Sequence, residues 1–219
     1  MIFRVCLLGF ILFGFHFGLA QGIRLDEIKS ATRDSSNAYF YPRLIDEFVS
    51  QPEYFSADKG KFLYYGQIYS RYYKLFDFGK NVGQFNLQMQ RGRMKKAIPL
   101  GEKVLEENPV NLEVLMKLGY CYRKDNQPEK ARTMQDRAAV LIRAIESNGD
   151  GSSEEQAYKV ISISDEYVVM GKEGFTQISR KSKQQAHSVI DILEVRDAKS
   201  KDPRPLYFEV LYNHDAIPK

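Results

Sequence analysis

The sequence predicts an α+β protein, in which a helical part over residues 21–150 packs against a smaller part, residues 151–219, that contains a sheet. Two observations carry this prediction. Apolar residues recur at helical spacing through the first part, and the last part contains runs of β-branched and aromatic residues that are typical of strands. A chain of 219 residues can also bury a sizeable core without disulfide bonds.

Residues 1–20 have the layout of a cleavable signal peptide. Arg4 gives a positive start, an apolar run follows, and Gly18-Leu19-Ala20 forms a small-x-small cleavage site. An uncleaved anchor is the alternative, although the run is at the short end of the ~20 apolar residues of a membrane helix. Cys6 precedes the apolar run and is therefore not placed for lipid attachment at a cleavage site. We expect an exported protein, periplasmic or secreted, with no stable membrane insertion after cleavage.

Cleavage after Ala20 removes Arg4 and no acidic residue, so the formal net charge falls from +4 to +3. This excess is far below that of a dedicated nucleic-acid binder, and export argues in the same direction, so we expect no nucleic-acid partner. Cys121 is left as the single thiol, which excludes an intrachain disulfide and a thiolate zinc cluster. We predict no cofactor.

The first helices are predicted from spacing and from proline. A short helix is expected near residues 25–28, and a second over 42–50 with Pro42 in its first turn. A third helix is expected to be capped by Ser56 or Asp58 and to run through Lys61 to about residue 71. Residues 79–83 are expected to form a loop. They lack the Gly-x4-Gly-Lys-Ser/Thr pattern of a phosphate-binding loop.

Residues 93–147 contain an internal repeat, in which Ala97 and Val104 return as Ala131 and Ala138. Between these pairs stands Leu115-x2-Leu118-Gly119-x2-Tyr122. The arrangement resembles the tetratricopeptide repeat, whose pattern is Trp-x2-Leu-Gly-x2-Tyr followed by Ala, Phe and Pro with a period of about 34 residues. The resemblance implies antiparallel helical pairs. The sequence departs from the pattern at three positions, namely Leu115, Gln135 and Arg143.

An earlier segment, Phe62-x2-Tyr65-Gly66-x2-Tyr69, has the same spacing. Its helical pair would carry an insertion from 72 to about 91, and repeat proteins place insertions on one face, often the binding face. Asn126-x2-Glu129, with Pro128 between them, predicts the capped start of the second helix of the next pair. Two pairs are too few to stand alone, so we expect the carboxy-terminal part to cover the open end.

The carboxy-terminal part starts where Asn148-Gly149-Asp150-Gly151 breaks the helices. Ser152-x2-Glu155 predicts the start of a short helix. Residues 160–163 fit either a strand or a helix, and both interpretations stay open. Strands are predicted at 175–178, 189–195 and 206–212. They are expected to form a small antiparallel sheet packed on the helices.

Several short motifs occur in an order that resembles a family of exported bacterial proteins known only as a domain of unknown function. The resemblance covers about residues 40–212. It implies a signal sequence, an envelope or secreted location and tetratricopeptide-like helices, and it supplies no catalytic residues. The motifs are Leu63-Tyr64-Tyr65-Gly66, Ala97-Ile98, Glu107-Asn108-Pro109, Gly149-Asp150-Gly151, Val160-Ile161, Asp165-Glu166-Tyr167 and Tyr207-Phe208.

Two groups of residues are candidates for binding. The first lies in an aromatic run that could form a ligand platform, although an aromatic core with hydroxyls at its rim is the favoured interpretation. The second is an acidic pair with a tyrosine, which could act on a glycan if one acid met a distant partner such as Asp191. A surface turn or a helix start is the favoured interpretation of this pair. The candidate residues are Tyr64, Tyr65, Tyr69, Asp165, Glu166 and Tyr167.

Other candidate chemistries are weaker. Residues 146–151 imitate the start of a calcium loop, but Ala157 stands where the loop needs a bidentate Glu. His187 and His214 accompany no Gly-x-Ser-x-Gly motif. Cys121 lies on a packing helix and is expected to be a buried structural thiol.

We therefore expect a non-enzymatic protein-interaction module of the cell envelope, whose partner is an envelope or secreted protein. The repeat pattern and the lack of a complete catalytic motif motivate this expectation. The alternative is an uncharacterised glycan or peptide hydrolase that uses the acids near 165. A deep pocket that holds Asp165 or Glu166 with a second acid would favour the hydrolase.

Overall fold

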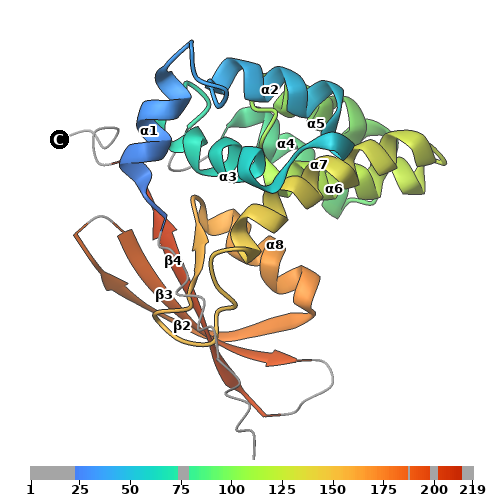
Figure 1. Cartoon of the computed structure of the whole chain (residues 1–219). Helices are drawn as coiled ribbons and strands as arrows, with labels where there is room; N and C mark the ends of the chain where they lie inside the picture. Colours follow the sequence, from blue (N-terminus) through green and yellow to red (C-terminus); the bar gives the residue numbers. More distant parts are fainter. Residues whose placement is uncertain (1–22, 74–78, 187, 198–201, 214–219) are drawn as a thin grey trace, which may run out of the picture.

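The computed structural model describes residues 23–73, 79–186, 188–197 and 202–213. The predicted signal peptide, His187 and His214 lie outside these residues. Figure 1 shows a helical layer above a twisted sheet, with α8 between them. The elements are α1 (Leu25–Arg33), α2 (Tyr41–Ser50), η1 (Pro52–Tyr54), α3 (Ala57–Gly66), η2 (Gln67–Tyr69), α4 (Lys80–Gln90), α5 (Met94–Glu107), α6 (Leu112–Lys124), α7 (Pro128–Glu146), β1 (Tyr158–Val160), α8 (Ile163–Glu173), β2 (Phe175–Gln184), β3 (Ser188–Asp197) and β4 (Arg204–Leu211).

The first three helices lie close to the predicted ranges. In α2, Leu44 and Phe48 are fully buried one turn apart, which confirms the helix expected over 42–50. Ser56 Oγ accepts a hydrogen bond from the Lys59 amide and caps α3, which confirms the first of the two predicted caps. The helix ends at Gly66 instead of 71, and a 3₁₀ turn follows.

The next four helices form two hairpins, α4 with α5 and α6 with α7, each joined by a short turn. The loop expected over 79–83 was wrong, because α4 begins at Lys80 and places Val82 and Phe85 in the core. Within the second hairpin, a Cβ on Gly119 would lie 3.3 Å from Met134 Cβ, so glycine permits the close packing of α6 against α7.

The predicted cap of α7 was also wrong. The N-cap is Gln127, which makes no side-chain capping bond, while Pro128 occupies the first turn as expected. Asn126 instead adopts a φ of 57°, a left-handed conformation that asparagine tolerates better than most residues, and it forms the turn between the helices.

The sheet has the strand order β1-β4-β3-β2. The three predicted strands correspond to β2, β3 and β4, and their pairing is antiparallel as expected. β1 adds a parallel pair with β4, in which Tyr158 lies opposite Phe208, so the sheet is mixed. Residues 160–163 divide between the two open interpretations, since β1 ends at Val160 and α8 begins at Ile163.

The short helix expected after Ser152 was wrong. Residues 151–156 form turns, in which the Gln156 carbonyl accepts hydrogen bonds from the Asp150 and Gly151 amides. Gly149 makes this path possible, because a Cβ there would lie 2.4 Å from the Gln156 carbonyl oxygen.

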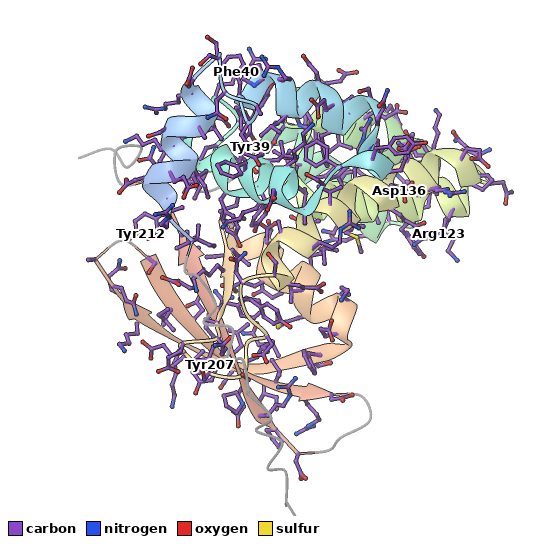
Figure 2. All side chains as sticks on the ribbon, viewed as in Figure 1. Tyr39, Phe40, Arg123, Asp136, Tyr207 and Tyr212 are labelled. Atoms are coloured by element: carbon purple, nitrogen blue, oxygen red, sulfur yellow. The ribbon has the colours of Figure 1, made fainter. Side chains whose placement is uncertain are left out.

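One core of buried apolar side chains runs through both parts of the chain, from Ile28 in α1 to Leu211 in β4. Figure 2 shows Arg123 near the end of the helical layer away from the sheet, Asp136 further in along α7, and Tyr207 on the sheet itself. Within the described residues, none of the helices has the length and apolar character needed to cross a bilayer.

Candidate functional site

A groove of about 790 Å³ lies between α4, α6 and α8. Each helix contributes one face, so the groove exists only where the two hairpins meet the carboxy-terminal part. Three apolar side chains in it are open to solvent, with exposed fractions of 38% for Met116, 39% for Ile163 and 52% for Tyr167. The full lining is Val82, Asn86, Asn111, Glu113, Met116, Lys117, Ser162, Ile163, Ser164, Tyr167, Val168, Gly171 and Lys172.

The charged side chains that line the groove form ion pairs with neighbouring residues of the same chain. Lys117 forms an ion pair with Glu113 one turn away on α6, and its Nζ donates to Asn86 Oδ1 at 2.9 Å. Lys172 pairs with Glu146 and Glu173, which raise the pKa of its ammonium group. The groove therefore offers apolar surface without a strong excess of either charge.

Asp165 is not exposed to the groove but is held in a buried contact with the helical layer. The Tyr64 hydroxyl donates to Asp165 Oδ2 at 2.7 Å and accepts from the Ile161 amide at 3.2 Å. Burial raises the pKa of Asp165 to about 7, and the hydrogen bond from Tyr64 acts in the opposite direction. Asp165 also borders a small cavity of about 40 Å³.

Tyr65 makes a second contact between the two parts. Its hydroxyl lies 3.0 Å from the Lys159 carbonyl oxygen, to which it donates, and it accepts from Asn148 Nδ2 at 3.3 Å. The rings of Tyr64 and Tyr65 meet edge to face, with centroids 4.9 Å apart. Both side chains are fully buried, so in this structure neither forms an open platform for a ligand.

Glu166 packs against the sheet, in contact with Arg180 of β2 and Asp191 of β3. Arg180 forms an ion pair with Glu166, and its second terminal nitrogen donates to Asp191 Oδ2 at 3.2 Å. The Ser182 hydroxyl donates to Asp191 as well. Burial raises the pKa of Glu166 to about 9, with a further contribution from its hydrogen bond to Asp191, while Arg180 lowers it. One guanidinium therefore contacts two carboxyl groups.

One acid near 165 thus does meet Asp191, but the contact joins α8 to the sheet. Glu166 and Asp191 are 0% and 2% exposed, and neither lines the groove. A glycosidase needs two carboxyl groups that face a sugar, and these two face a guanidinium instead. Among the described residues, the buried atoms without a hydrogen-bond partner include Glu166 Oε1 and Arg180 Nε.

Of the six candidate binding residues, Tyr167 is the one that lines the groove. Tyr69 lies away from it, half-buried, with Lys29 and Arg33 over its ring at 5.5 and 5.9 Å. Sequence reasoning missed Met116 and Ile163. A usable signal was present for Met116, since Glu113, Met116 and Lys117 lie three and four residues apart on one face of α6.

The calcium hypothesis finds no supporting geometry at residues 146–157. Asp150 Oδ1 accepts from the Ser152 amide at 2.9 Å, which is a local turn, and Ala157 is buried. Throughout the described ranges, no three His, Cys, Asp or Glu side chains converge to hold a metal ion.

Cys121 is buried, as predicted.

The fold and the groove define an α+β protein with an apolar cleft at the junction of helical hairpins and a mixed sheet. The family model named Domain of unknown function (DUF4919) matches residues 26–217. The chain belongs to this family, and the match covers both the helical part and the sheet. No curated protein and no solved structure matches the chain.

Proposed function

We propose that this protein is a non-enzymatic protein-interaction module of the cell envelope, exported through the predicted signal peptide, whose groove binds an apolar segment of a partner protein. The observation that carries the proposal is the half-exposed trio of Met116, Ile163 and Tyr167, which lies in a groove whose charges are paired.

The shape and chemistry of the groove favour an amphipathic helix as the occupant. Its volume of about 790 Å³ falls within the range of about 300–1,000 Å³ typical of ligand sites. Its walls are the faces of three helices, an arrangement suited to the recognition mode in which a helix lays its apolar face into a groove. Because Lys117 and Lys172 already have acidic partners, the bound face is expected to be uncharged.

The hydrolase alternative rested on the acids near 165. Their carboxyl groups are buried and bonded to Tyr64 and Arg180, and the groove that could hold a substrate contains neither of them. No feature of the described residues favours this second function.

Site-specific photocrosslinking tests the interaction. A benzoylphenylalanine at Tyr167 is expected to give one discrete adduct when cells that naturally make the protein are irradiated, and the captured peptide should form an amphipathic helix. The control is the same probe at Tyr54, an exposed tyrosine (79%) on η1. Equal labelling from both positions, or a captured segment without an apolar face, would contradict the proposal.

The location is tested separately. The intact mass of the protein from these cells should correspond to a chain that starts at Gln21, and the protein should fractionate with the envelope or the medium. A mass that includes residues 1–20, or recovery with cytoplasmic proteins, would refute export without deciding what the groove binds.

A further inference from the structure

Three sulfur atoms from three different helices converge where the end of α4 and the start of α5 meet α6. Cys121 Sγ of α6 lies 3.3 Å from Met89 Sδ in the last turn of α4 and 3.8 Å from Met94 Sδ at the start of α5. The two methionines flank the short turn at residues 91–93 that joins α4 to α5. The helical hairpin therefore brings both thioethers to the same thiol.

The spacing of these sulfurs suits a shared metal ion. Two sulfurs, each about 2.3 Å from a metal, as in zinc–thiolate bonds, lie about 4.0 Å apart when the angle at the metal is about 120°. The observed separations of 3.3 and 3.8 Å approach this value. Methionine has three rotatable bonds, so the two thioethers can move outward by the required distances of about 0.7 Å for Met89 and about 0.2 Å for Met94.

Ligand softness selects the kind of ion. Thiolate and thioether sulfurs favour Cu(I), whereas carboxylates and carbonyls favour Mg²⁺ and Ca²⁺. We propose that Cys121, Met89 and Met94 form a three-coordinate site for a soft monovalent cation, Cu(I).

Charge balance supports a monovalent ion over a divalent one. The site supplies a single negative charge, from the Cys121 thiolate, so a bound Cu⁺ gives a neutral unit. A divalent ion would leave an uncompensated positive charge beside the core, which is costly to bury. A cysteine must lose its thiol proton to bind a metal ion. Binding therefore forms a Cu–S bond and releases that one proton, with no change of oxidation state.

The site is placed within reach of solvent. Cys121 is buried, but both methionine side chains are only partly buried and lie at the rim of the core. Arg91 and Arg93 are exposed on the turn between them. Figure 2 labels Arg123, two residues after Cys121, at the end of the helical layer away from the sheet.

Native mass spectrometry with Ag(I), a redox-inert analogue, and anaerobic competition of Cu(I) with bicinchoninate test the site. The wild-type protein is expected to bind one ion. Met89→Leu and Met94→Leu should each weaken Cu(I) binding at least about tenfold, because even changes beyond the first shell of ligands weaken metal sites by about 10–100-fold. Cys121→Ser should abolish the 1:1 complex.

Met116→Leu is the matched control, since Met116 lies on the same helix but lines the groove. It should leave the affinity for Cu(I) unchanged. Thermal unfolding of each variant verifies the fold. Failure of the wild type to bind one ion would overturn the proposal. So would a Met89→Leu/Met94→Leu variant with wild-type affinity, because the thiol would then act alone and the sulfur contacts would be core packing.

Discussion

The contact between Tyr64 and Asp165 gives the sharpest test of how the two parts of the chain are held together. The change Tyr64→Phe keeps the buried ring and removes only the hydroxyl. Asp165 then loses the donor at 2.7 Å, and the Ile161 amide loses its acceptor at 3.2 Å. A hydrogen bond to a charged group contributes about 1.5–3 kcal/mol, and an unsatisfied buried donor costs about 1–3 kcal/mol. Because the two losses share one hydroxyl and are not additive, we expect the free energy of unfolding to fall by about 2–4 kcal/mol.

The assay is urea unfolding followed by far-ultraviolet circular dichroism, since the chain contains no Trp. The control is Tyr54→Phe, which removes a hydroxyl from an exposed side chain and should change stability by less than about 0.5 kcal/mol. The effect of Tyr64→Phe should also be larger at pH 8 than at pH 5. The pKa of Asp165 is about 7, so its carboxylate, which needs the donor most, predominates only at the higher pH. Equal losses for the two variants would refute the proposed role of Tyr64.

Three further predictions concern the same junction. Between pH 4 and 7 the folded state keeps a proton on Asp165 that the unfolded chain has lost, so the free energy of unfolding of the wild type should fall as pH rises, by up to about 1.4 kcal/mol per pH unit. Asp165→Asn should make this decline shallower, and parallel curves for the two proteins in urea unfolding would exclude the linkage. Arg180→Met leaves two buried carboxyl groups without their cation and should lower the free energy of unfolding by about 3–5 kcal/mol, whereas Lys181→Met, at an exposed neighbour, should change it little. Equal unfolding midpoints for the two variants would show that the Glu166–Arg180–Asp191 contacts do not hold α8 to the sheet. Gly149→Ala forces a Cβ against backbone oxygens and should lower the free energy of unfolding by about 1–3 kcal/mol, while Gly171→Ala, with open space around it in α8, should raise it by about 0.5–1 kcal/mol. Thermal unfolding with the opposite order of stability would contradict the close approach at Gly149.

Local patterns predicted most of the elements. The apolar spacing of α2 and the β-branched runs of β3 and β4 depend on nearby residues, so a single sequence suffices to find them. The loop expected over 79–83 failed because its two glycines suggested a turn. Gly83 in fact lies on an open face of α4, where an added Cβ would meet nothing within 4 Å, and a helix tolerates glycine there at a modest cost.

The features that the sequence could not predict all depend on partners far along the chain. Asp165 and Glu166 have the polarity of surface residues, and their burial becomes possible only because Tyr64 and Arg180 reach them from other elements. The groove likewise needs α4, α6 and α8 together. Periodicity reports which face of one helix is apolar, but not which exposed faces meet.

The parallel pairing of β1 with β4 has a consequence for the order in which the protein can be made. β1 lies ahead of α8, yet its neighbour in the sheet is the last strand described. As the chain leaves the ribosome, residues 158–160 cannot pair within the sheet until residues 208–210 have been synthesised. Tyr64 must wait in the same way for Asp165, about a hundred residues later. Neither the β1 edge of the sheet nor the Tyr64–Asp165 contact can therefore form from the amino-terminal residues alone, and both depend on segments synthesised later.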